Sequence, residues 1–152
     1  MHNILNNLNL ESILERVKNV SENDKALWGK MNAHEMLCHT ADQIRLTTGE
    51  KTSPFRGNAA TKTIVKKLIL WGMPAPKGKV ETTKELKQGA GGTKPGNFTE
   101  DKQALISLLS DFKNSFEEKK KVEHPAFGNM NKKQWGRLIY VHMDHHLRQF
   151  GK

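Results

Sequence analysis

The sequence predicts an all-α fold, a bundle of helices with one long crossover, and three observations support this prediction. Apolar residues recur at three- and four-residue spacing in separate segments of the 152-residue chain, as they do on the buried face of a helix. Residues that favour helix starts and helix ends bracket those segments. No run of four or more alternating apolar and polar residues, which would indicate a strand, stands out.

The first two predicted helices lie in the N-terminal third of the chain. An apolar stripe at helical spacing predicts the first one, with Leu10, Ile13, Leu14 and Val17. Asn32 stands three residues before Glu35, as in a capping box, and Gly49 offers a stop. The second helix is therefore expected from about residue 33 to residue 47.

The last two predicted helices lie in the C-terminal third. Thr99 offers a capping hydroxyl ahead of acidic residues and an apolar stripe, so the third helix is expected from Thr99 to about Glu118. Residues 124–128 form a predicted turn, and Asn131 opens a fourth helix that continues to about Phe150. Connections that look short predict antiparallel hairpins of helices one and two and of helices three and four.

The chain has the length of one domain, so a single domain over residues 1–152 is expected. The segment 49–98 separates the second helix from the third. It holds one short amphipathic run, Thr63 to Trp71, followed by a stretch rich in Pro, Gly and Lys. We interpret this segment as a crossover within the bundle, and not as a second domain.

The charge is concentrated in that crossover. The formal net charge is +9, and residues 61–94 contain eight lysines, two glutamates and no arginine. Base readout and bidentate phosphate contacts favour Arg, and stacking on bases needs aromatic residues between the cations. The pattern therefore favours a solvated lysine surface and argues against nucleic acid as a partner.

Neither a membrane span nor a secretory signal is predicted. The longest apolar stretch, Ile64 to Met73, is interrupted by two lysines and is shorter than the roughly 20 residues that a bilayer span needs. The N-terminus lacks a cationic start followed by an apolar core. Cys38 is the single cysteine, so no internal disulfide can form. These features predict a cytoplasmic protein in a reducing compartment.

Two histidines on the last predicted helix indicate a metal site. Successive helical residues turn by about 100°, so His142 and His146 lie about 40° apart, one turn from each other on one face. That face also carries Trp135 and Leu138, which directs both imidazoles toward the interior, where an unpartnered polar ring costs free energy. A metal ion would satisfy both nitrogens, but a stable site needs a third ligand from another helix.

His39, in the middle of the second predicted helix, is the best candidate for that third ligand. His34 lies in the first turn of the same helix, where an exposed or capping role is expected. His145 is an alternative ligand that helix geometry alone does not exclude. A histidine cluster hydrogen-bonded to its neighbours, without any ion, is a further alternative, because a bare His-x-x-x-His pair is weakly specific.

Three stretches of the chain resemble a DinB-like family, in a branch catalogued as a domain of unknown function. They are Trp28-Gly29-Lys30-Met31-Asn32-Ala33-His34-Glu35-Met36-Leu37-Cys38-His39-Thr40-Ala41-Asp42, His124-Pro125-Ala126-Phe127-Gly128 and His142-Met143-Asp144-His145-His146-Leu147-Arg148-Gln149-Phe150. The resemblance implies a DinB-like four-helix bundle with a long crossover between helices two and three. It also implies that a divalent metal, zinc or nickel by the chemistry of imidazole ligands, binds to His39, His142 and His146. Thr40 departs from the more usual aliphatic residue.

Relatives in that superfamily include metal-dependent enzymes that use a small thiol as cosubstrate. The resemblance therefore implies a metal-dependent transferase or hydrolase that uses a small thiol or water. His145 and Asp42 are the candidate catalytic residues for proton transfer, with His145 preferred because imidazole titrates near neutral pH. The alternative is a metal-stabilised binding or stress-response module without catalysis.

Three further expectations concern other residues. Asp42 and Gln149 each lie three residues beyond a predicted ligand and are candidates for orienting it. Cys38 is expected to be a buried thiol outside the metal site. Apolar residues of the crossover predict a homodimer about a twofold axis, through Leu68, Ile69 and Trp71.

Overall fold

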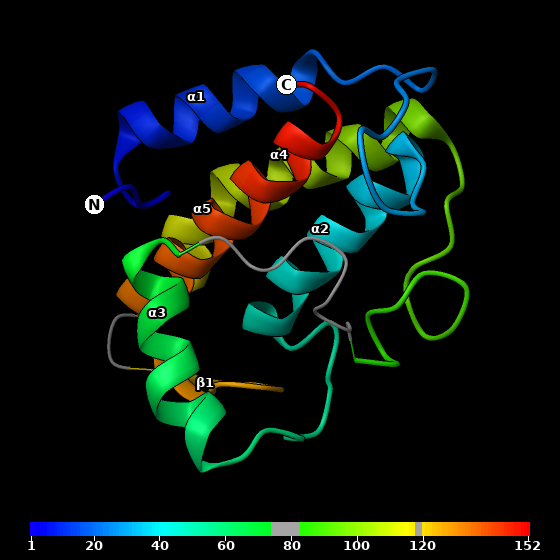
Figure 1. Cartoon of the computed structure of the whole chain (residues 1–152). Helices are drawn as coiled ribbons and strands as arrows, with labels where there is room; N and C mark the ends of the chain where they lie inside the picture. Colours follow the sequence, from blue (N-terminus) through cyan, green and yellow to red (C-terminus); the bar gives the residue numbers. More distant parts are fainter. Residues whose placement is uncertain (74–82, 118–119) are drawn as a thin grey trace.

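The computed structural model describes residues 1–73, 83–117 and 120–152, and these are mostly helical (Figure 1). Four long helices correspond to the four predicted ones: α1 (Asn7–Lys18), α2 (Ala33–Thr48), α4 (Phe98–Ser115) and α5 (Lys132–Gln149). Glu118, the predicted end of the third helix, and residues 74–82 of the predicted crossover lie outside the described residues. Within the described part of the chain, no helix combines the length and the hydropathy of a membrane span.

An asparagine caps the N-terminus of each long helix. The predicted capping boxes at Asn32 and Asn131 are both present, with the side chain accepting a backbone N–H and the N3 side chain accepting in return. For α4 the cap is Asn97, which accepts from the backbone N–H groups of Thr99 and Glu100, and not the predicted Thr99. Asn and Thr are both favoured N-cap residues, with Asn the better of the two, so the stronger signal lay at Asn97, two residues before Thr99.

The long helices pack in a ring in which α1 lies diagonally opposite α2, and α4 lies diagonally opposite α5. α2 packs against α4 and α5, and α1 packs against the same two helices, with α5 running between α1 and α2 (Figure 1). The predicted hairpins of α1 with α2 and of α4 with α5 are therefore wrong. Both connections, residues 19–32 and 116–131, exceed the roughly 2–8 residues that force antiparallel neighbours.

One hydrophobic core receives side chains from all four long helices. Ile13, Leu37, Leu109 and Ile139, one from each helix, are at most 1% exposed. Full burial of one such side chain stabilises the fold by roughly 1.5–3 kcal/mol. The core therefore holds α2 and α5 in fixed register, and the predicted ligands come from these two helices.

The predicted amphipathic run of the crossover is helical. It begins as the π-helical turn η1 (Thr61–Val65) and continues as α3 (Lys66–Trp71), which ends at Gly72 with φ of 108° and packs against α5. A left-handed φ of this kind suits glycine, which has no Cβ. The sequence thus predicted this element, but not its place beside α5.

A small antiparallel sheet follows α4, which the prediction of an all-α fold missed. β1 (Lys121–His124) pairs with β2 (Gly128–Asn131), and His124 lies opposite Gly128 across the predicted turn. The indole N–H of Trp135 donates to the carbonyl oxygen of Val122 at 3.1 Å and fastens the sheet to α5. Gly and Asn are poor strand formers, so strand propensity gave no signal here, and tertiary contact decides the conformation.

Candidate metal centre

Three histidine side chains meet between α2 and α5. The Nε2 atom of His142 lies 3.1 Å from Nε2 of His39 and 3.1 Å from Nε2 of His146. His39 and His146 are 6% and 7% exposed. Nitrogens that share one zinc ion at about 2.0–2.1 Å lie roughly 3 Å apart, so this spacing fits a common ion. The structure thus brings together the three residues predicted as ligands.

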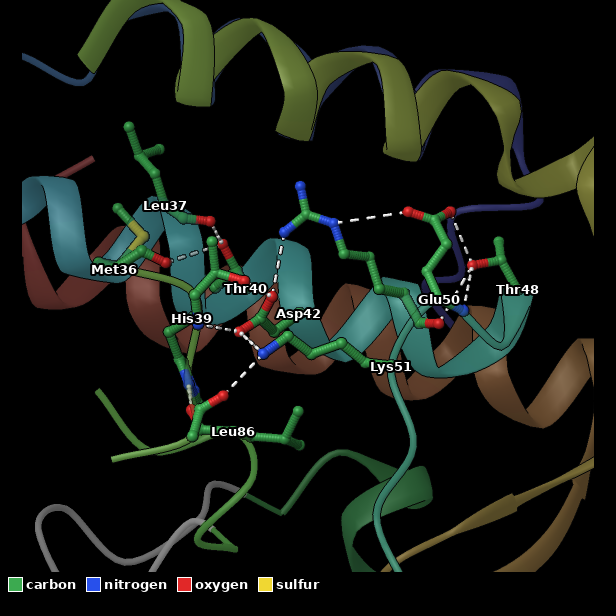
Figure 2. Close-up of polar contacts among 12 residues, drawn as sticks. Met36, Leu37, His39, Thr40, Asp42, Thr48, Glu50, Lys51 and Leu86 are labelled. Carbon is green, nitrogen blue, oxygen red and sulfur yellow. Dashed lines mark hydrogen bonds and ion pairs between the residues drawn. The ribbon is translucent and has the colours of Figure 1, made fainter. Parts of the chain in front are cut away.

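The second ring nitrogen of His39 has a partner that fixes its hydrogen. Nδ1 of His39 lies 3.2 Å from the carbonyl oxygen of Leu86 (Figure 2). Because a carbonyl oxygen only accepts, Nδ1 must carry the hydrogen and donate. In the neutral ring, Nε2 of His39 then carries no hydrogen, and its lone pair points at the other two histidines.

His146 is held in the same way by Gln149. Its Nδ1 lies 2.8 Å from Oε1 of Gln149, whose Nε2 donates to the carbonyl oxygen of Trp28 at 2.6 Å. The second bond sets the orientation of the amide, so Nδ1 of His146 is also a donor. Gly29 permits this approach, because a Cβ there would lie 2.5 Å from Nε2 of Gln149. Gln149 thus contacts His146, as its position predicted, and the part of His146 as a metal ligand stays a prediction.

Burial keeps these imidazoles neutral. It lowers the pKa of His146 to about 3, with the neighbouring His39 adding to the effect. Burial, and then the nearby His146 and His39, lowers the pKa of His142 well below its ordinary value. Burial also lowers the pKa of His39, although the Leu86 carbonyl and the Asp42 carboxylate act in the opposite direction. Neutral imidazole is the form that binds a metal.

The neutral cluster is not satisfied by hydrogen bonds alone. Nε2 of His142 carries at most one hydrogen, so only one of its two 3.1 Å contacts can be a hydrogen bond. The lone pair of the other neighbour is then left without a donor in a buried place; if His142 carries its hydrogen on Nδ1 instead, three Nε2 lone pairs face one another, and either arrangement costs free energy. Nδ1 of His142 is also buried and has no hydrogen-bond partner among the described residues. A cation among the three Nε2 atoms removes the lone-pair conflict, so the donor set fits a divalent metal.

A cavity of about 640 Å³ lies beside the cluster and is lined by His39 and His142, but not by His146. The surface of its wall is mainly apolar, with contributions from Trp28, Ile69, Leu86, Phe127, Leu138 and Val141, and it also includes charged residues such as Arg137 and Asp144. An ion held by the three nitrogens would thus face a largely apolar space on one side. Ligand sites in proteins have this character, an apolar cavity with a few converging polar groups.

The comparisons with known proteins give a family without an assigned function. Residues 3–152 match the model of a family described as "Protein of unknown function (DUF1569)". The chain belongs to this family. No curated protein and no solved structure matches it. The predicted membership in a branch of unknown function is confirmed, and the wider DinB-like affiliation stays a prediction.

His145 of this DUF1569 protein lines the cavity without joining the three nitrogens. Its ring stands edge-on to His146, with centroids 5.1 Å apart, and edge-on to Trp28 at 5.9 Å. The predicted alternative in which His145 replaces a ligand finds no support, because His142 and His146 both point at His39. The role of His145 in proton transfer stays a prediction.

Asp42 lies on α2 three residues beyond His39, and its side chain is fully buried. Its carboxylate accepts from the backbone N–H of Thr93 at 2.7 Å and from the Thr93 hydroxyl at 2.6 Å. It also pairs with Arg45 at 3.0 Å and with Lys51 at 3.1 Å. Asp42 is not among the residues that line the cavity. Its predicted part in catalysis is untested, and its contacts are those of an anchor.

The anchored segment is the one that orients His39 (Figure 2). Lys51 pairs with Asp42 and also donates to the carbonyl oxygen of Gly91 at 2.8 Å. Gly91 in turn donates from its backbone N–H to the carbonyl oxygen of Lys84 at 2.9 Å. Residues 83–93, which include Leu86, are therefore tied to α2 by a buried charge.

Two partners of the site were not predicted from the sequence. The Leu86 carbonyl lies in the crossover and gave no signal, because every residue has a carbonyl. His124, assigned only to a turn, also lines the cavity, and its Nδ1 accepts from the backbone N–H groups of Ala126 and Phe127 at 3.1 and 3.2 Å. A polar side chain that opens a turn often accepts such bonds, and this was the available signal.

A second group of three ligand-type side chains lies on another side of α2: His34, Cys38 and Asp101. Nε2 of His34 lies 2.7 Å from Oδ2 of Asp101, so the predicted exposed or capping role of His34 is wrong. Cys38 is 2% exposed, as predicted. Burial raises the pKa of its thiol to about 12, and the carboxylate of Asp101 adds to the effect.

Proposed function

We propose that this DUF1569 protein binds a divalent metal ion through Nε2 of His39, His142 and His146 and uses it in a transferase or hydrolase reaction. The observation that carries the proposal is the convergence of three buried nitrogens, two of which have their hydrogen on the far side of the ring. No arrangement of hydrogens on three neutral rings satisfies both 3.1 Å contacts.

The ion we propose is zinc or nickel, the metals that imidazole ligands suit, with cellular supply deciding between them. Such an ion lowers the pKa of coordinated water toward about 7 and favours deprotonation of a coordinated thiol. The protein's own residues then do three things. Leu86 and Gln149 hold the ligand rings in place, the cavity gives a small thiol or water access to the side of His39 and His142, and His145 accepts or returns a proton.

The cavity favours catalysis over a purely structural ion. Structural zinc sites are closed by four protein ligands, whereas catalytic sites keep one position open. His39 and His142 both line the cavity, so an ion between them would have a free side that a small thiol or water could reach. In the alternative, a metal-stabilised binding or stress-response module, the same ion fastens α2 to α5 without turnover.

We propose in addition that the fold is a single-domain four-helix bundle of the DinB-like superfamily. Three features support this: the shared core of α1, α2, α4 and α5, the crossover between α2 and α4, and the histidine set. A cytoplasmic location is supported by Cys38 as the single cysteine, since a buried free thiol suits a reducing compartment.

A homodimer through the crossover is a further proposal. Leu68 is 37% and Trp71 is 72% exposed on α3, which supports an apolar contact there. Ile69, grouped with them in the prediction, is half-buried and packs against the core instead. Light scattering over a wide concentration range should give twice the monomer mass, and a monomer mass throughout would remove the proposal.

Metal analysis tests the site directly. Untagged wild-type protein, purified without chelator, is analysed for metals beside His142→Ala and His145→Ala. The His142→Ala variant should contain about one ion per chain fewer than wild type, because two histidines are too few for a stable site. His145 is next to His146 in the chain but is not a proposed ligand, so His145→Ala should keep the wild-type metal content. Equal content in wild type and His142→Ala would remove the proposal.

An activity screen separates the enzyme from the binding module. Metal-loaded protein is screened with small thiols and electrophilic acceptors, and with hydrolysable substrates, against His146→Ala. Turnover in wild type that is lost in His146→Ala supports catalysis at the metal. If wild type and His146→Ala both lack turnover, or turn over equally, the binding module replaces the enzyme as the proposed function.

A further inference from the structure

Helix α2 presents ligand-type side chains on two different sides. His34 and Cys38 are four residues apart, which places them one turn from each other on one face. Asp101 meets them from the first turn of α4, the helix that packs on this side of α2. The imidazole nitrogen, the sulfur and a carboxylate oxygen lie within 4.8 Å of one another. His39 follows Cys38 in the chain but points about 100° away, toward α5.

An ion could reach this cluster from solvent, because two of its three side chains are partly exposed. Cys38 forms its buried floor at 2% exposure. The side chains of His34 and Asp101 are 11% and 25% exposed and form its rim. The ring of Phe98 stands edge-on to His34, with centroids 5.4 Å apart, and supports it. The backbone N–H of Gly96 donates to Oδ2 of Asp101 at 2.9 Å, which holds the carboxylate toward the other two side chains.

The chemistry of the three groups selects a particular class of ion. A thiolate and a carboxylate together carry two negative charges, which a divalent cation neutralises, so the filled cluster adds no net charge to a buried place. Thiolate and imidazole prefer zinc and cobalt to magnesium or calcium. Without the ion, the same atoms are joined by the short His34–Asp101 contact and by a hydrogen bond from the thiol to Asp101.

We infer that His34, Cys38 and Asp101 form a second metal site, separate from the three-histidine centre, which takes a zinc-like divalent ion and fastens α2 to α4. The layout repeats that of the first site: two ligands four residues apart on one helix and the third from a helix packed against it. The exposed rim leaves the fourth position to water. The inference does not depend on the proposed catalytic function.

Titration with cobalt(II) under reducing conditions tests the inference. Cobalt bound to a thiolate gives an intense near-ultraviolet charge-transfer band, which imidazole ligands do not give, and Cys38 is the single cysteine of the chain. The band should appear in wild type and in His142→Ala with about one equivalent bound to the thiol. It should be absent in Cys38→Ser. The His142→Ala arm separates this result from the fate of the first site.

The other two ligands are tested by affinity. His34→Ala and Asp101→Asn should each weaken the cobalt that produces the band by at least about tenfold, since even outer contacts of metal sites cost 10–100-fold. Asp111→Asn, an exposed position on the same helix, should leave the affinity unchanged and serves as the matched control. Circular dichroism confirms that each variant is folded.

Two results would overturn the inference. One is the lack of a thiolate band in folded, reduced wild type at excess cobalt. The other is a band with undiminished affinity in both His34→Ala and Asp101→Asn, which would mean that the thiol binds cobalt by itself.

Discussion

The helices and the irregular segments contribute to the three-histidine centre in different ways. α2 and α5 supply all three nitrogens, and buried apolar side chains along their length hold them together. Residues 83–93 supply the Leu86 carbonyl that orients His39, and the loop before α2 supplies the Trp28 carbonyl that holds Gln149, the partner of His146. These segments are held mainly by a few buried polar contacts, such as those of Asp42. Core packing therefore sets where the ligands are, and polar anchors set how they point.

The largest effect is expected from breaking the anchor of the irregular segment. In Asp42→Asn, Arg45 and Lys51 lose their shared carboxylate, and an amide replaces an acceptor that faces Thr93. Removing one partner from a buried charge network costs about 3 kcal/mol or more in the free energy of unfolding. Urea denaturation measures this loss.

The matched control for Asp42 is Glu50→Gln. Glu50 pairs with the same Arg45, at 3.8 Å, but its side chain is 57% exposed. An exposed pair contributes roughly 0–1 kcal/mol, so this variant should stay close to wild type. If both variants lost the same stability, the anchor role of Asp42 would be refuted.

The next effect is the stabilisation that a metal ion gives by joining α2 and α5. Metal at 100 times its dissociation constant should raise the free energy of unfolding by about 2.7 kcal/mol, because it binds only the folded arrangement of α2 and α5. The measurement is thermal unfolding with and without chelator, in a Cys38→Ala background that lacks the thiol ligand of the second site. Adding His39→Ala should abolish the rise, whereas adding His145→Ala should preserve it. A rise that survives in His39→Ala would contradict the three-histidine centre.

A smaller effect is expected where a helix meets an irregular segment. Gln149→Leu removes the acceptor for Nδ1 of His146 and the donor to the Trp28 carbonyl, while keeping a similar volume. Loss of such an orienting contact typically lowers metal affinity by 10–100-fold, which is about 1.4–2.7 kcal/mol. Competition with a metal indicator dye measures the change. Unaltered affinity would show that packing alone orients His146.

The last prediction concerns a pH dependence of the free energy of unfolding that arises in the hairpin. Burial, with the charge of Lys66 adding to it, lowers the pKa of His124 to about 3 from an unfolded value near 6.5. Between these pH values the unfolded chain binds the extra proton, so acidification lowers stability by at most about 1.4 kcal/mol per pH unit.

His124→Asn isolates this contribution. Asn keeps an acceptor for the backbone N–H groups of Ala126 and Phe127 but does not titrate. The free energy of unfolding, measured by urea denaturation from pH 7 to pH 4, should fall less steeply in the variant. Identical slopes would mean that His124 becomes protonated in the folded state.

Prediction from the sequence succeeded where structure is local. Capping boxes at Asn32 and Asn131 marked two helix starts, because capping bonds span only three residues. It failed for the β1–β2 hairpin and for the helix pairing. Strand propensity is absent from Gly128–Asn131, and two connections were long enough to allow a diagonal arrangement.

For the candidate site, the spacing of His142 and His146 follows from the pitch of one helix, so the sequence was sufficient to predict that they share a face. The place of His39 in the middle of another amphipathic helix made it the best candidate for a third ligand, and a resemblance supported it, but local periodicity carries no information about which helix faces which. Packing alone places the Leu86 carbonyl beside His39. Packing alone also decides that Cys38 faces α4 whereas its neighbour His39 faces α5. Contacts between residues far apart in the chain depend on the shape of the whole core, and this shape exists only once the helices have packed.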